Sequence, residues 1–400
     1  MPQKREIAVE DLRIGMYVSE LDRPWLDTKF AFQGFPITSE ADLVRLRQTC
    51  KKVFIDLEKG SAPDDSGAPG AIRTAQAAVL RYPQKVSVER ELDPAKTVLR
   101  ECKRVLEKTI RVLVAGGELD AAGVKSSVEK IADSIERNPD AMLLLTKVRQ
   151  KDEKQLERAL DVSVLMMTFG RFLQLPRGEL DLLGQAGLLL DIGKLKVPDA
   201  ILHKKGSPNA EELQLARQHV MHSAAMLREI RGFSPELVDI VLRHHERHDG
   251  SGYPAGLPGA DIGMLGSIAG IVDSYSAMTS QRPYAEQMSP SNALGALHKE
   301  RGTLYNEALV EQFIQCIGIY PVGSVVQLNS GEVGVVIAQN RVRRLQPRVM
   351  VLLDAQSNPI SPHRILDLIK EPKTASGEPY RIRRTLESSQ LPLDPRDFFL

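Results

Sequence analysis

Imidazole and carboxylate side chains recur in the central part of the chain, in segments with helical apolar spacing. Asp191 follows the apolar run LLL, and Asp273 lies inside the apolar segment GSIAGIVDSYSAM. Between them come His219 and the adjacent pair His244 and His245. A carboxylate in such surroundings is costly to bury unless it is paired or bound to a cation. Imidazole and carboxylate together suit borderline transition metals, so these residues predict a site for divalent Mn, Fe, Co, Ni or Zn.

A single histidine or aspartate in a helix is more often a structural polar residue than a metal ligand, so the prediction depends on the cluster. A second feature is the run RHHERHDGSGYP, in which glycine and proline follow the two histidines. Such a composition predicts a tight loop. Alone, this loop would be read as a connector.

Three motifs of this region resemble the HD-GYP family of bacterial proteins: DIGK at 191–194, HHERHDGSGYP at 244–254 and VDSYSAMTSQRPY at 272–284. The resemblance spans residues 155–320. It implies an all-helical HD phosphohydrolase core that hydrolyses cyclic di-GMP, a bacterial second messenger, to pGpG or GMP through two or three metal ions. The flanking segments resemble the small N-terminal domain and the β-rich C-terminal extension of one branch of the family.

The resemblance also implies two sets of metal ligands. In the family, one metal takes an upstream His, both residues of a His-Asp doublet and a distal Asp. The other takes the doublet Asp and three downstream histidines. In this chain the second set corresponds to Asp191, His219, His244 and His245, all of which are present. Of the first set, Asp191 and Asp273 remain.

Two positions of the first set depart from the family pattern. Leu190 stands where the doublet has its histidine, and leucine offers no lone pair to a metal. Arg158 aligns with the upstream histidine, where its fixed positive charge opposes a neighbouring cation. None of His203, His222 and His248 lies at a family ligand position. Because only the second ligand set is complete, we expect at most one metal per chain. The reaction needs two cations about 3.5–4 Å apart that act jointly on water and phosphate, so we also expect weak or absent phosphodiesterase activity.

Other residues of the family pattern are present. Asp191 and Lys194 are the predicted catalytic residues, and Lys194 would also meet a phosphate as a point charge. A solvated helix lysine is the alternative interpretation of Lys194. The remaining predicted substrate-binding residues are Tyr253, Arg282 and Tyr284, which would meet guanine or phosphate groups; the planar fork of arginine suits phosphate.

The elements that position these residues fall in separate segments, and the predicted fold is mainly α. Short alternating apolar runs over 1–58 predict a small α+β N-terminal domain, and the Gly-, Pro-, Ala- and Ser-rich stretch 59–93 predicts a flexible linker. Apolar residues at i, i+3, i+4 and i+7 predict a helical region over 94–320 that contains the HD-GYP core. Short β-branched runs predict a β-rich module at 321–370, before an irregular tail at 371–400.

The composition is that of a globular protein. It is 42% hydrophobic and 26% charged with a net charge of +1, so charge gives no reason to expect binding to DNA or to a membrane. No apolar block follows the charges near the N-terminus and no apolar run is long enough to span a bilayer, so we expect no secretory signal and a cytoplasmic protein. Cys50, Cys102 and Cys316 have no CxxC spacing and are interpreted as reduced structural thiols.

The leading hypothesis is a degenerate HD-GYP protein that binds cyclic di-GMP or a signalling partner. Two alternatives stay open. One is an active metal-dependent phosphodiesterase, in which the second ligand set, helped by Lys194, still hydrolyses the dinucleotide. The other is an interaction scaffold that contacts a diguanylate cyclase through the GYP loop and the QRPY motif. The sequence leaves homodimer formation and the signal sensed by the N-terminal domain open.

Overall fold

The computed structural model describes residues 4–22, 35–37, 40–56, 82, 84–148, 154–202, 204, 206–280, 287–340 and 343–386. The chain divides into two compact units, residues 1–79 and 80–400. None of the helices within these described ranges is long and apolar enough to cross a membrane.

The first unit places one helix on a four-stranded antiparallel sheet of strand order β1-β4-β2-β3. Its elements are β1 (Lys4–Ala8), β2 (Tyr17–Leu21), β3 (Phe35–Pro36), α1 (Glu40–Thr49) and β4 (Lys52–Asp56). Leu43 and Leu46 of α1 share an apolar core with Val18, Val53 and Ile55 of the sheet. The α+β character predicted for the N-terminal domain is therefore confirmed.

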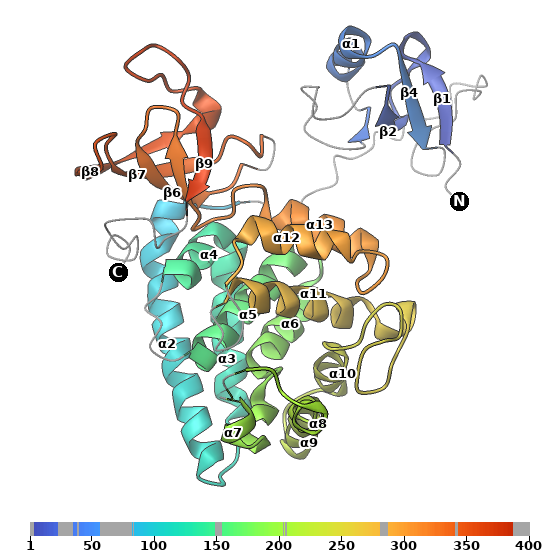
Figure 1. Cartoon of the computed structure of the whole chain (residues 1–400), viewed down its shortest axis with the longest axis vertical. Helices are drawn as coiled ribbons and strands as arrows, with labels where there is room; N and C mark the ends of the chain where they lie inside the picture. Colours follow the sequence, from blue (N-terminus) through green and yellow to red (C-terminus); the bar gives the residue numbers. More distant parts are fainter. Residues whose placement is uncertain are drawn as a thin grey trace. The chain divides into compact units, whose positions relative to one another are not determined.

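The second unit is built from helices α2 to α13 and a terminal sheet (Figure 1). The helices are α2 (Val88–Val114), α3 (Ala121–Arg137), α4 (Pro139–Val148), α5 (Lys154–Phe172), α6 (Arg177–Leu189), α7 (Asp199–Leu202), α8 (Ala210–Arg217), α9 (His219–Glu229), α10 (Pro235–Arg243), α11 (Met264–Thr279), α12 (Pro290–Lys299) and α13 (Glu307–Ile317). The mainly helical fold predicted from the apolar spacing is confirmed.

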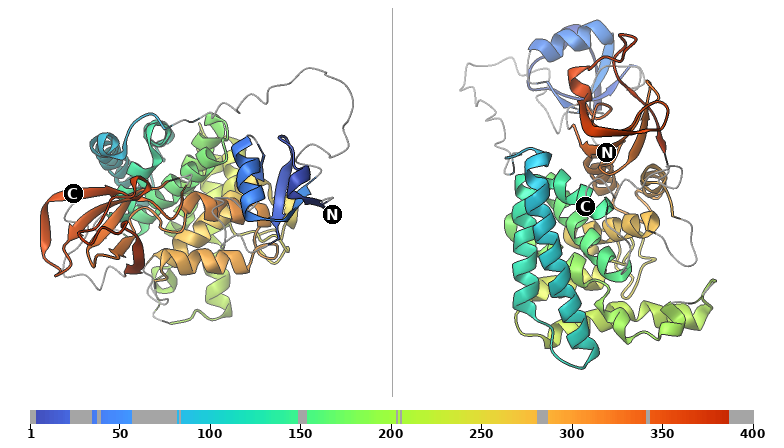
Figure 2. Two further views of the ribbon diagram at one scale, coloured as in Figure 1. Left: turned by 90° about the horizontal axis from the view of Figure 1, so that it is seen from above. Right: turned by 90° about the vertical axis from the view of Figure 1, so that its left-hand side faces the viewer.

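Helices α5 and α6 form the centre of the helical part, because they pack along each other and both contact α3 and α11. Gly187 makes this packing close, since a Cβ there would lie 2.4 Å from the Cα of Ser163. In contrast, α8 has no buried residue, and Figure 2 shows the α7–α8 segment, in yellow-green, projecting from the helical body. The candidate site lies between α5, α9, α10 and α11.

The terminal sheet is antiparallel with strand order β8-β7-β6-β5-β9. Its strands are β5 (Val325–Leu328), β6 (Val333–Ala338), β7 (Arg348–Leu353), β8 (Pro359–Asp367) and β9 (Ile382–Leu386). The backbone N–H of Gln339 donates to Asp140 Oδ2 at 3.1 Å, and Arg348 forms an ion pair with Glu89. These contacts join the sheet to α4 and α2, and the sheet itself confirms the predicted β-rich character of the C-terminal part.

Two elements differ from what the sequence predicted. Strand β9 lies in the segment 371–400, for which we expected irregular structure; its IRRTL sequence is mostly polar and exposed, so it lacks an apolar signal. Helix α2 begins at Val88, whereas the sequence predicts that the helical region begins at Pro94. Glu91 anchors this first part of α2 to α3, because its buried carboxylate accepts hydrogen bonds from Ser134 and Arg137. Such a tertiary contact leaves no periodic pattern in the sequence.

Candidate metal and phosphate site

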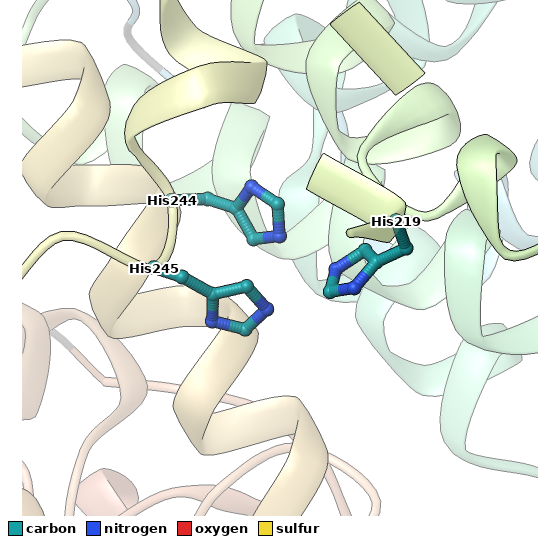
Figure 3. A group of neighbouring side chains, drawn as sticks. All are labelled: His219, His244 and His245. Atoms are coloured by element: carbon teal, nitrogen blue, oxygen red, sulfur yellow. The ribbon is translucent and has the colours of Figure 1, made fainter. Parts of the chain in front are cut away.

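The predicted metal ligands come together from separate elements. Asp191 lies in the turn after α6, His219 begins α9, His244 and His245 follow α10, and Asp273 lies on α11. The three histidines, here called the histidine trio, offer nitrogen atoms that all lie within 4.8 Å of one another. Figure 3 shows the His244 and His245 rings, from one segment, facing the ring of His219 from another.

Close backbone packing brings Asp191 beside the trio. The N–H of Gly193 donates to Ser223 Oγ at 2.8 Å, and this hydroxyl donates to the carbonyl of Leu190 at 2.8 Å. A Cβ at Gly193 would lie 2.1 Å from the carbonyl oxygen of His219, so only glycine permits this approach of the turn to α9. As a result, Asp191 Oδ1 lies 3.4 Å from His219 Nε2.

Backbone carbonyls orient two rings of the trio. Nδ1 of His219 lies 2.7 Å from the carbonyl oxygen of Ala216, and Nδ1 of His244 lies 2.6 Å from that of Val241. A carbonyl oxygen can only accept, so each Nδ1 carries the hydrogen and each Nε2 keeps its lone pair. Both Nε2 atoms are buried and have no hydrogen-bond partner in the part of the chain that the structure describes.

Burial also lowers the pKa of each histidine in the trio, that of His244 to about 4. All three rings are therefore neutral at pH 7, the form in which imidazole binds a metal. Neutral rings with unpaired, converging lone pairs fit a divalent metal ion. Such a metal would act as a Lewis acid toward a phosphate ester.

Arg158 of α5 lies between the two carboxylates of the site. Its Nη1 donates to Asp191 Oδ2, and its Nη2 donates to Asp273 Oδ1 at 2.6 Å. Lys194 donates to the same Oδ2 of Asp191 at 2.7 Å. Burial alone would raise the pKa of Asp191, but Lys194 and Arg158 outweigh it and hold the pKa well below its usual value. Burial acts the same way on Asp273, and Arg158 again outweighs it, so the pKa of Asp273 is lowered too.

The guanidinium thus fills the space between Asp191 and Asp273 that a metal of the first ligand set would need. A metal there would have to displace a fixed cation or lie against it. Leu190 supplies no ligand either, because its side chain is 2% exposed and packs in the helical core. The described residues therefore do not fit a metal in the first set. The trio of the second set does fit one, and Asp191 Oδ1 lies beside His219 Nε2, while Oδ2 accepts from Arg158 and Lys194.

The other predicted site residues divide into two groups. Tyr253 stacks on His245, with ring centroids 4.7 Å apart and planes at 23°, and burial raises the pKa of its hydroxyl. Lys194 lies at the site, as described above. Arg282 and Tyr284 lie outside the described residues, as does His203. His222 and His248 are not members of the trio.

Sequence reasoning missed two residues around the trio, Glu246 and Arg217. Glu246 is buried, and its carboxylate accepts backbone hydrogen bonds from the following loop. Its position directly after two predicted metal ligands was the available signal. Arg217 lies over the Tyr253 ring, a contact that no pattern in the sequence announces.

Three family models match this chain and define the class of protein to which it belongs. An HD domain model matches residues 140–309, which contain every residue of the candidate site. A domain of unknown function matches residues 4–124, and a KOW domain associated with HD domains matches residues 325–375. The class is that of HD-domain phosphohydrolases, which are metal-dependent.

Relatives with known activities narrow the class. The cyclic di-GMP phosphodiesterase PA4108 of Pseudomonas aeruginosa is 36% identical over 368 residues, which are 91% of this chain and 89% of the relative. A cyclic di-GMP phosphodiesterase of Thermotoga maritima is 40% identical over 133 residues, 32% of this chain and 36% of its own. The 3'3'-cGAMP-specific phosphodiesterase 2 of Vibrio cholerae is 34% identical over 142 residues, 35% of this chain and 27% of its own. The chain belongs to the HD-GYP family, and the resemblance seen in its motifs is confirmed.

Proposed function

We propose that this protein binds cyclic di-GMP in its HD-GYP domain, holds at most one metal ion there, and has lost most or all phosphodiesterase activity. One observation carries the proposal: the Arg158 guanidinium contacts both Asp191 and Asp273. A protein cation thereby neutralises the carboxylates that a second metal would need. Two-metal phosphodiester hydrolysis uses both cations at the attacking and leaving oxygens, so a site restricted to one metal is expected to bind the nucleotide without cleaving it efficiently.

The charges of the site support binding of an anion. Arg158 and Lys194 balance Asp191 and Asp273, while the trio is neutral, so a divalent metal at the trio would leave the site with a net positive charge. The side chain of Lys194 is 28% exposed, which lets its ammonium group meet a ligand at the surface of the site. A phosphodiester of cyclic di-GMP carries the complementary charge.

Retained hydrolysis is a second candidate function, favoured by the intact second ligand set. The nitrogen atoms of the trio lie within 4.8 Å of one another and Asp191 Oδ1 lies 3.4 Å from His219 Nε2, and a relative aligned over 91% of this chain is a cyclic di-GMP phosphodiesterase. In this alternative, Lys194 would offset the phosphate charge in place of the second metal.

Parallel binding and turnover measurements separate the two functions. Purified protein supplemented with Mn²⁺, Fe²⁺ or Zn²⁺ is mixed with cyclic di-GMP; affinity is measured by calorimetry and products by chromatography. We expect binding without accumulation of pGpG or GMP. Turnover in the ordinary enzyme range of about 1–1000 per second would overturn the proposal in favour of the enzyme. A protein that neither binds nor cleaves the nucleotide would instead favour a scaffold for a partner such as a diguanylate cyclase.

A further inference from the structure

Arg217, the last residue of α8, is an exposed cation beside the site. Within the described ranges, no hydrogen bond or ion pair engages its guanidinium group. Its central carbon lies 4.8 Å from the centroid of the Tyr253 ring, which is within the range of a cation–π interaction. This contact with an aromatic face leaves the N–H groups at the edge of the guanidinium available as donors.

Tyr253 connects this cation to the histidine trio. One face of its ring stacks on His245 with centroids 4.7 Å apart. Arg217, Tyr253 and His245 therefore form a series of contacts that begins at a predicted metal ligand and ends at the Arg217 guanidinium.

Hydrogen bonds to Glu246 hold the loop that carries Tyr253. The carboxylate of Glu246, which is 4% exposed, accepts hydrogen bonds from the N–H groups of Ala255 at 2.7 Å and Leu257 at 2.9 Å. The N–H of Tyr253 donates to the carbonyl of His245 at 3.2 Å. The loop also packs closely against the backbone of Glu246 at Gly252, where a Cβ would be 2.4 Å from the Cα of Glu246. Tyr253 is thus a preorganised platform for the guanidinium.

We propose that Arg217 binds a phosphodiester group of the cyclic dinucleotide beside Tyr253 and the histidine trio. This inference rests on the proposed function and names a second anchor for the same ligand. Lys194 reaches the trio through Asp191 and His219, whereas Arg217 reaches it through Tyr253 and His245. A cyclic dinucleotide carries two phosphodiester groups, so it offers one anionic group to each of these two cations. The planar fork of a guanidinium can donate to two oxygens of one phosphate.

Calorimetric titration of the full chain with cyclic di-GMP at several salt concentrations tests the inference. Arg217→Met should bind at least about tenfold more weakly, the loss expected for a charge-assisted hydrogen bond, and its affinity should depend less on salt. The matched control is Arg228→Met, which removes an exposed charge of the same kind on α9 and should leave affinity unchanged. Tyr253→Leu removes the platform, so it should weaken binding in the parent but add little in the Arg217→Met background.

The outcomes separate this inference from the function on which it rests. If the parent binds and Arg217→Met binds equally well with the same salt dependence, the assignment of Arg217 is wrong and the proposed function stands. An equal loss in Arg228→Met would also overturn it, because net charge alone would then account for the effect. A parent that does not bind cyclic di-GMP would overturn the proposed function and this inference together.

Discussion

Arg158 and Asp273, which lie 115 positions apart in the sequence, are joined by a hydrogen-bonded ion pair of 2.6 Å inside the HD-GYP core. The same guanidinium also pairs with Asp191, so one protein cation links α5, α11 and the turn after α6. The side chain of Asp273 is 8% exposed, which means that neither charge is fully solvated. Arg158 therefore links three segments of the core, and we propose that it also opposes a metal in the first ligand set.

Removing the guanidinium should destabilise the protein. In Arg158→Met, Lys194 still pairs with Asp191, but Asp273 becomes a buried carboxylate without a cation. Breaking one side of a buried pair costs about 3–5 kcal/mol, so we expect a loss of about 3 kcal/mol in the free energy of unfolding, measured by urea denaturation. Lys130→Met breaks the exposed pair with Glu101 and should change stability little. Equal effects of the two substitutions would contradict the structural role of Arg158.

The histidine trio predicts a pH dependence of the metal-free protein. The pKa of His244 is about 4 in the folded state, because burial disfavours the charged ring, and about 6.5 in the unfolded chain. Between these values the unfolded state binds more protons, so stability falls as pH falls from about 6.5 to about 4, by about 3 kcal/mol for this residue. Chemical denaturation of chelator-treated protein across this range checks the slope. His244→Gln should flatten it; an unchanged slope would show that His244 does not titrate on unfolding in this range.

Neutralising the predicted phosphate-binding residues should weaken the binding of cyclic di-GMP. We expect Lys194→Met and Arg282→Met each to cost about 1.5–3 kcal/mol, the scale of a hydrogen bond to a charged group. Lys194 reaches the site through its bond to Asp191, whereas Arg282 lies outside the described residues, so its contribution is a prediction from the motif alone. Calorimetry on both variants measures the change in the binding free energy of cyclic di-GMP. Unchanged affinity in both would remove the phosphate-binding role and favour the scaffold.

Much of the candidate site could be predicted from the sequence, but the double contact of Arg158 on which the proposed function rests could not. His244 and His245 were predictable because they fall within the motif HHERHDGSGYP, and His219 because it lies between that motif and DIGK, as the family resemblance implies. The aligned position of Arg158 also predicted a positive charge at the first ligand set, and the structure places its guanidinium against Asp191 and Asp273. That its guanidinium would bridge two carboxylates was not predictable, since the partners come from distant segments whose packing no local pattern encodes.

Other features escaped the sequence for the same reason. Glu246 accepts hydrogen bonds from backbone amides of the following loop. Every residue except proline has such an amide, so the sequence gives no sign of these bonds. Arg217 shows neither apolar periodicity nor a motif, and its role follows only from the position of Tyr253. In the fold, β9 was missed because its sequence alternates too weakly to predict a strand.

We predict that rebuilding the first ligand set raises the phosphodiesterase activity of the protein. Leu190→His with Arg158→His removes the obstructing cation and returns both missing imidazoles. Leu190 is 2% exposed in an apolar core, so a polar ring there is costly and the folding of the variant must be checked by circular dichroism first. If the variant folds, we expect a gain in cyclic di-GMP hydrolysis over the parent. A folded variant that takes up a second metal without gaining activity would show that the catalytic loss extends beyond these two positions.

The metal content of the purified parent tests the central claim most directly. Elemental analysis after saturation with Mn²⁺, Fe²⁺ or Zn²⁺ and removal of loosely bound ions gives the number of metals per chain. Because Arg158 occupies the space between Asp191 and Asp273, we predict at most one tightly bound transition metal, held by the histidine trio and Asp191. Two or more tightly bound metals per chain would contradict the claim that a guanidinium has replaced the first metal.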